Sequence, residues 1–69
     1  MNYTEKLRDL RKKLGFTQIK MAEVLGVTQC SVSFYERGEV YPMGQARKKY
    51  IELARSIKYP LKIEELLRE

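Results

Sequence analysis

The segment from Thr17 to Gly38, TQIKMAEVLGVTQCSVSFYERG, constrains the fold of this chain more than any other part. Thr17 and Thr28 can each cap a helix N-terminus with a side-chain hydroxyl group. Gly26 lies between them, at the point where the chain must bend sharply. The spacing predicts two helices of about nine residues each, joined by a tight turn.

The second of these helices has two different sides when it is drawn as a helical wheel. The side that can pack inward carries branched and aromatic residues among small polar ones, namely Thr28, Ser31, Val32 and Tyr35. The outward side carries Gln29, Cys30, Ser33, Phe34 and Arg37. A glutamine amide can donate to and accept from adenine in the major groove of DNA, and small hydroxyl groups fit beside it. The outward side is therefore either a surface that reads base edges or a solvated helix face that contacts nothing.

A series of spaced residues extends this pattern beyond the two helices. The series consists of Arg11, Gly15-Phe16-Thr17-Gln18, Ala22, Leu25-Gly26-Val27-Thr28-Gln29, Val32-Ser33, Tyr35-Glu36-Arg37-Gly38 and Pro42. On these residues the sequence resembles the phage repressor and Cro family of helix-turn-helix proteins, also called the xenobiotic-response-element type. The likeness covers roughly half of the chain.

The resemblance implies a role for several of these residues. Gln18 would clamp a backbone phosphate at the start of the first helix of the pair, where the helix amides also favour an anion. The groove of a double-stranded DNA operator would be faced by Gln29, Cys30, Ser33 and Phe34. Arg11 and Glu36 match a family pair expected to form a mostly buried ion pair, which would fix the orientation of the second helix. The alternative is that both charges lie in solvent.

Cys30 and Phe34 depart from the pattern of the family, and both lie on the outward side of the second helix. Most relatives carry a polar or basic residue at the position of Phe34. Its ring is either a contact for thymine methyl groups or an apolar patch for another protein. A third reading is that the ring folds back onto neighbouring side chains.

The positive charge of the chain lies on either side of the motif rather than within it. Residues 15–41 carry Lys20 and Arg37 against three glutamates and are net −1, whereas residues 1–14 and 42–69 are each +3 and the chain is +5. Basic side chains that could contact phosphates are Lys20, Arg47, Lys48 and Lys49. Two or three such contacts would make binding sensitive to salt. The alternative for the lysine run is a solvated helix face.

Apolar periodicity predicts the remaining helices. Tyr3, Leu7, Leu10 and Leu14 define a first helix that ends at Gly15. A fourth helix over about residues 43–57 has an apolar side made of Met43, Ala46, Tyr50, Leu53, Ala54 and Ile57. A short fifth helix over about residues 61–68 follows Pro60, with Ile63, Leu66 and Leu67 on its apolar side. Strand signals are absent, so we expect an all-α, compact five-helix domain of the Cro/repressor type that spans residues 1–69.

The C-terminal third departs from the family more than the motif does. It is a few residues longer than usual, which changes the region through which small members of the family often dimerise. Four residues there are more apolar than a free surface requires, namely Tyr41, Tyr59, Leu61 and Ile63. They are either part of the core or a patch that meets a second copy or a different protein.

The composition argues against catalysis, metal binding and membrane insertion. The chain has no histidine, so its one cysteine, Cys30, lacks the usual partner base and cannot form a zinc site alone. We expect no cofactor. No apolar run approaches the roughly 20 residues needed to cross a membrane, and the N-terminus lacks a signal-peptide core. A single thiol fits the reducing cytoplasm, here that of a bacterial host cell.

Two functions remain as hypotheses. The first is a sequence-specific transcriptional regulator of the phage Cro/repressor type, which would read an operator with the helix over residues 28–37 as a weak homodimer. The second is a modulator or antirepressor in a phage genetic switch, which would use the same face to bind a cognate repressor protein. In the second case Phe34 would supply much of the binding energy, as aromatic anchors usually do.

Overall fold

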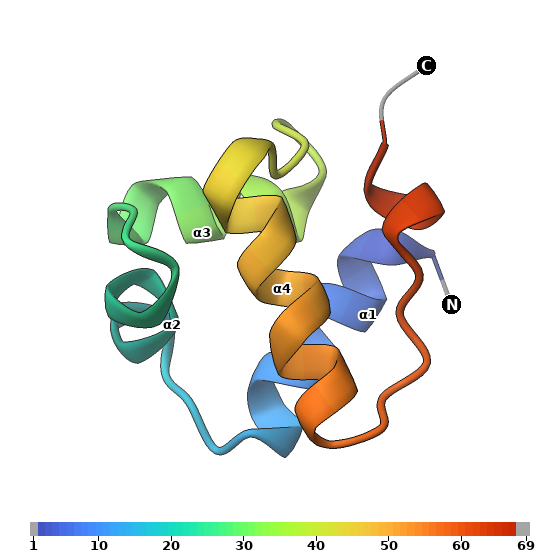
Figure 1. Ribbon diagram of the computed structural model, residues 1–69. Coiled ribbons are helices and arrows are strands. Elements are labelled where there is room, and N and C mark those ends of the chain that lie inside the picture. Colours follow the sequence, from blue (N-terminus) through green and yellow to red (C-terminus); the bar gives the residue numbers. More distant parts are fainter. Residues whose placement is uncertain (1, 68–69) are drawn as a thin grey trace.

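The computed structural model describes residues 2–67, which form four α-helices and one short 3₁₀ helix (Figure 1). In chain order these are α1 (Tyr3–Lys13), α2 (Gln18–Leu25), α3 (Gln29–Arg37), α4 (Gly44–Ser56) and η1 (Ile63–Leu66). No strand occurs in this part of the chain. The expectation of an all-α fold is confirmed, but the expected count of five α-helices is wrong.

The first three helices begin at side-chain caps. Asn2 accepts from the backbone N–H of Glu5 at 3.0 Å, and Glu5 accepts in return from the N–H of Asn2, which completes a capping box. Thr17 and Thr28 accept from the N–H groups of Lys20 and Ser31 at 3.0 and 3.2 Å. Both threonine caps expected from the sequence are therefore present.

The core lies where α1, α2, α3 and α4 meet. Its buried apolar side chains are Leu7, Leu10, Met21, Ala22, Leu25, Val32, Tyr35, Ala46, Tyr50, Ile51, Ala54, Leu61 and Leu66. Met43 and Ile57, which the periodicity placed on the core side of the fourth helix, are exposed. They occupy the two cap positions of α4, outside its regular turns, so the helical period no longer directs them inward.

The expected fifth helix is wrong in type and extent. The chain after Pro60 is extended at Lys62, forms η1, and is extended again at Leu67, while residue 68 lies outside the described residues. Leu61 and Leu66 are both buried, whereas Ile63 and Leu67 are exposed. In a regular helix, Leu67 would share a face with Ile63. The extended ends of this segment instead let Leu61 and Leu66 reach the core.

Polar contacts fasten this C-terminal segment to α1. Lys6 Nζ lies 2.6 Å from a Glu65 carboxylate oxygen and donates to the Pro60 carbonyl at 3.2 Å. The Tyr59 hydroxyl donates to Asp9 at 2.7 Å, and burial with this bond raises the pKa of Tyr59 to about 12. The sequence left four apolar residues of this region open as either core residues or a surface patch. Among them, Leu61 is buried in the core, Tyr59 is half-buried and Ile63 is exposed. Tyr41 is half-buried and stacks on Tyr3, with ring centroids 4.7 Å apart.

Candidate nucleic-acid interface

Helix α3 presents one face to the core and the other to solvent. Val32, Tyr35 and Glu36 are buried. The side chains expected on the outward face are Gln29, Cys30 and Arg37, all exposed, Ser33, half-buried, and Phe34, which is 37% exposed. The wheel is wrong about Thr28, which is exposed because it caps the helix, and Ser31 is half-buried beside it. The outward face therefore exists largely as the sequence predicts.

Glu36 fixes α3 to the helices around it. Arg11 Nε lies 2.7 Å from Glu36 Oε2, and Arg11 Nη2 donates to Glu36 Oε1 at 3.2 Å. Arg11 Nη1 also donates to the Phe16 carbonyl at 3.0 Å. Glu36 is only 3% exposed, so its charge depends on these donors. The pair suggested by the resemblance is present, and it sets the angle at which the outward face of α3 is held.

Gln18 joins the same network. Its amide Nε2 donates to Glu36 Oε1 at 3.2 Å from the first turn of α2. An amide NH₂ group has two hydrogens, so one stays available for a phosphate oxygen. The family resemblance implies a phosphate contact for Gln18 but does not predict its bond to Glu36. The two residues are 18 positions apart in the sequence, and no local pattern indicates such a contact.

Tyr50 of α4 lies against this network from the other side. Its ring packs edge-on to Tyr35 with centroids 6.1 Å apart, and its side chain is fully buried. Burial, and then the charge of Glu36, raises the pKa of its hydroxyl. The sequence predicted Tyr50 as a core residue only. Its contact with Tyr35 holds the middle of α4 in a fixed relation to α3.

Phe34 does not stand alone on the outward face. The Arg37 guanidinium lies 5.2 Å from the centroid of its ring, within the range of a cation–π contact. Arg37 Nε in turn lies 2.7 Å from Glu39 Oε2. The ring is thus partly covered by a neighbour, as the third reading of Phe34 expected, and partly open to solvent.

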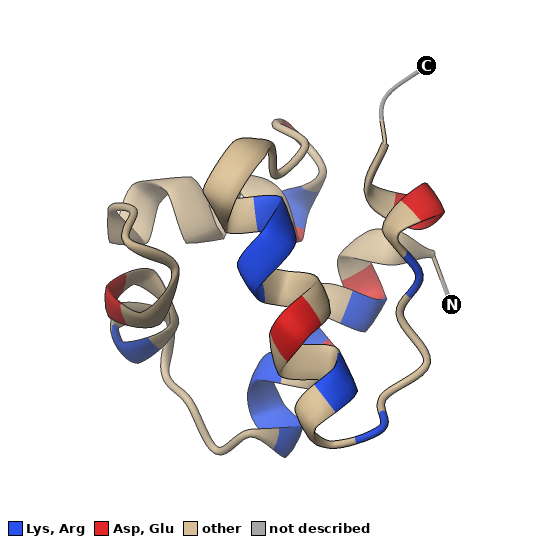
Figure 2. Cartoon of the chain, in the orientation of Figure 1, with Lys and Arg blue, Asp and Glu red and all other residues tan. Residues whose placement is uncertain are grey.

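The candidate phosphate contacts differ in their surroundings. Lys20 lies 3.9 Å from Glu23, and Lys49 lies 3.8 Å from Glu52, measured between charged atoms. Arg47 is half-buried and Lys48 is exposed, and within residues 2–67 neither forms an ion pair closer than 4.0 Å. Figure 2 shows basic residues on the first half of α4 and along α1.

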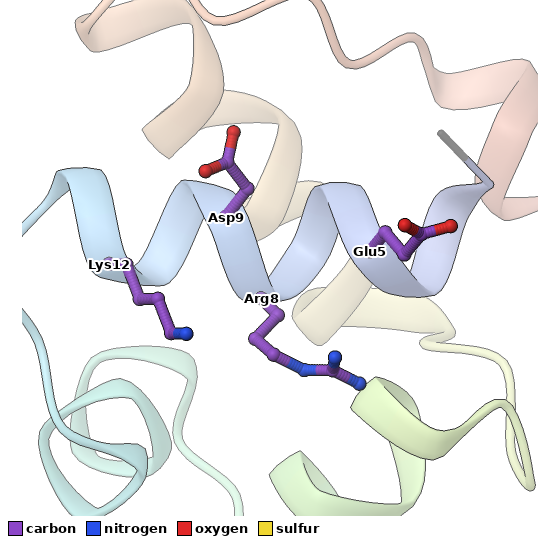
Figure 3. Close-up of a pocket in the computed structure, with 4 residues that line it drawn as sticks. All are labelled: Glu5, Arg8, Asp9 and Lys12. Carbon is purple, nitrogen blue, oxygen red and sulfur yellow. The ribbon is translucent and has the colours of Figure 1, made fainter.

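A shallow hollow of about 170 Å³ lies along α1, lined by Glu5, Arg8, Asp9 and Lys12 (Figure 3). Arg8 and Lys12 point to one side of the helix and Asp9 to the other. Arg8 donates to the carbonyl of Glu36 in the last turn of α3 at 2.9 Å, and Asp9 accepts from Tyr59. With Glu5 in the capping box of α1, three of the four charged groups therefore serve the fold, which leaves the outward face of α3 as the better candidate site.

The described residues contain no group of three potential metal ligands of the His, Cys, Asp or Glu type. None of the helices between residues 2 and 67 combines the length and the apolar character that a membrane span requires.

Comparison with known proteins points to the same region of the chain. A family model described as helix-turn-helix matches residues 7–53, from within α1 to within α4. A protein of Pyrococcus furiosus, named "Putative HTH-type transcriptional regulatory protein", is 51% identical over 35 residues. This alignment covers 51% of the present chain and 11% of the relative. No solved structure matches the chain.

Proposed function

The chain belongs to the helix-turn-helix family, and from this membership we propose that it is a DNA-binding transcriptional regulator. In finer detail, we propose a regulator of the phage Cro/repressor type that reads the major groove of an operator with α3. One observation carries the proposal: the outward face of α3 exposes the polar side chains of Gln29 and Arg37 beside Cys30 and Phe34, while its opposite face is anchored through the buried Glu36. A rigid helix with a free polar face is what direct reading of base edges requires.

Gln29 is the side chain we propose for base recognition. It lies in the first turn of α3 and is exposed, next to Cys30 and one turn from Ser33. A bidentate contact to adenine contributes about 1–3 kcal/mol of discrimination against other bases. Cys30 and Ser33 would occupy the groove beside it.

Contacts to the DNA backbone would set the register of α3 in the groove. We propose that Gln18 binds one phosphate with its remaining amide hydrogen, aided by the free N–H groups at the start of α2. Arg47 and Lys48 on α4 would bind phosphates on the other side of α3, with Lys20 and Lys49 as weaker contributors because of their acidic neighbours. Such contacts position the protein without reading sequence.

The test is a selection from randomised duplex DNA, followed by titration of the enriched sequence. We expect an enriched sequence motif and a binding constant that falls as salt is raised, with a logarithmic slope of about −2 to −3 per monomer. Gln29→Ala should lose about 1–3 kcal/mol on the enriched duplex and little on random duplex. Gln45→Ala, an exposed glutamine on α4, serves as the control.

Two outcomes would contradict the proposal. One is the absence of any shifted band at low salt with either random DNA or DNA from the region upstream of the gene. The other is an equal loss on enriched and random duplexes for Gln29→Ala, which would remove this residue from base recognition. If two copies bind one operator, the half-sites should lie about one helical turn apart.

A second candidate function is a modulator that binds a partner repressor through the same face. The observation in its favour is that Phe34, Val40 and Met43 are all exposed at or just after the end of α3. Phe34→Ala separates the two functions. It should abolish a complex with a repressor in the second case, and only change operator preference in the first.

A further inference from the structure

Each of the two basic residues within the motif has an acidic neighbour. Lys20 lies 3.9 Å from Glu23 on α2, and Arg37 lies 2.7 Å from Glu39 just after α3. The remaining glutamate of the motif, Glu36, is buried with Arg11. The exposed charges of residues 15–41 therefore occur as two oppositely charged pairs, and the net −1 of this segment belongs to the buried Glu36, which Arg11 neutralises.

Glu39 is held close to the end of α3 by the backbone. Gly38 has a φ of +78°, a conformation that side chains disfavour, and the chain reverses there. The N–H of Glu39 then donates to the carbonyl of Phe34 at 3.0 Å. Because this turn is fixed, the backbone of Glu39 stays beside the end of α3 when the helix approaches DNA.

Arg37 is engaged on two sides before any DNA binds. Its Nε faces Glu39, and its guanidinium lies over the ring of Phe34. Both Arg37 and Glu39 are about half exposed, so the pair is weak enough to open. A phosphate that drew Arg37 away would, however, leave the carboxylate of Glu39 facing the DNA backbone without its partner.

We propose that Glu39 holds Arg37 away from the DNA phosphates and thereby limits the affinity of this interface for duplex DNA. This inference rests on the proposed DNA-binding function. It makes Glu39 an affinity-limiting residue that touches no base. Sequence discrimination by Gln29 would then act on a low background of nonspecific binding, because the limit applies to every sequence.

The experiment measures the affinity of Glu39→Gln for a fluorescently labelled random-sequence duplex of about 25 base pairs at about 50 mM salt. We expect binding about three- to tenfold tighter than that of the original chain, and a gain that shrinks as salt is raised, since the effect is electrostatic. The matched control is Glu64→Gln, which removes the same charge from η1, an exposed site outside α3 and the turn that follows it. It should change affinity less than twofold.

A double-mutant cycle tests whether Glu39 acts through Arg37. Arg37→Gln should cost little in the original chain, where Arg37 is already neutralised, and should remove most of the gain in the Glu39→Gln background. Thermal unfolding of each variant verifies that the fold is unchanged.

Three results would overturn the inference. Equal gains for Glu39→Gln and Glu64→Gln would mean that only the total charge matters. Weaker binding by Glu39→Gln would mean that Glu39 orients Arg37 for a contact. If neither the original chain nor any variant binds the duplex at low salt, the proposed DNA-binding function itself fails, and this inference fails with it.

Discussion

Helices α1 to α3 and the chain from α4 to η1 are specified by different kinds of information. Each of the first three helices begins at a side-chain cap, and α2 ends at Gly26 with a φ of 74°. Helix α4 begins at Gly44, its cap residue Met43 forms no side-chain cap bond, and Lys58, with a φ of 55°, follows its last turn. Side-chain caps thus mark the start of every helix in the N-terminal region, whereas α4 starts without one.

In the C-terminal region, contacts between residues far apart in the sequence define the structure instead. Lys6 with Glu65 and Tyr59 with Asp9 join residues at least 50 positions apart. Leu61 and Leu66 reach a core that is otherwise made by the four helices. The shape of the segment after α4 is therefore conditional on α1 being in place, and the following predictions probe this difference.

The largest effect is expected at the ion pair of the N-terminal region. Arg11→Ala leaves the buried carboxylate of Glu36 with only Gln18 and a distant Arg8, at 3.2 and 4.0 Å. We expect the free energy of unfolding to fall by about 3 kcal/mol, measured by urea denaturation. Lys12→Ala, an exposed change one residue away, should stay within about 0.5 kcal/mol. Equal effects of the two variants would show that the pair does not hold α3 in place.

A smaller loss is expected from the C-terminal segment. Leu66→Ala removes a fully buried side chain from η1 and should lower the free energy of unfolding by about 2 kcal/mol. Leu67→Ala, at a position that is 44% exposed, should stay within about 0.5 kcal/mol. If the two leucine variants lose the same amount, the segment after α4 does not pack as the structure shows.

The same difference explains which features could be predicted from the sequence. The caps at Thr17 and Thr28 and the outward face of α3 depend on neighbours within a few residues, and the sequence shows them directly. The end of the chain was predicted as a helix because Ile63, Leu66 and Leu67 have helical spacing, but tertiary contacts override that spacing. At the candidate site, the contacts of Gln18 with Glu36 and of Arg37 with Glu39 depend on side-chain positions that periodicity does not define.

The stability that the Lys6–Glu65 pair contributes to the C-terminal segment should depend on pH. The hydrogen bond from Lys6, and then that from the backbone N–H of Lys62, lowers the pKa of Glu65 from 4.5. The pKa of Glu65 is lower in the folded state than in the unfolded state. Its contribution to the free energy of unfolding is therefore present above pH 4.5 and is lost as the pH falls through the folded-state pKa. The pair is partly exposed, so we expect a loss of about 0.5–1 kcal/mol.

Glu65→Gln gives the comparison for this acid effect. The variant should be less stable than the original chain at neutral pH, and this difference in the free energy of unfolding should close as the pH falls below 4.5. Glu64 lies beside Glu65 on η1 and outside any ion pair in residues 2–67. Glu64→Gln should therefore be as stable as the original chain at every pH. A difference for Glu65→Gln that stays constant with pH would exclude the ion pair as its cause.

The smallest effect is expected at Lys58, in the turn after α4, and its comparison is Gly26, in the turn after α2. Lys58 adopts the left-handed conformation that Gly26 adopts after α2, but with a side chain that makes it costly. Lys58→Gly should therefore raise the free energy of unfolding by about 0.5 kcal/mol, because relief of strain exceeds the added freedom of the unfolded chain. Gly26→Ala should lower it by about 1 kcal/mol, since a Cβ there meets nothing within 4 Å and only the backbone conformation resists it. A gain for Lys58→Gly and a loss for Gly26→Ala would show that the turn after α2 already has the residue it requires. They would also show that the turn after α4 is strained and is held in place by the long-range contacts of the C-terminal region.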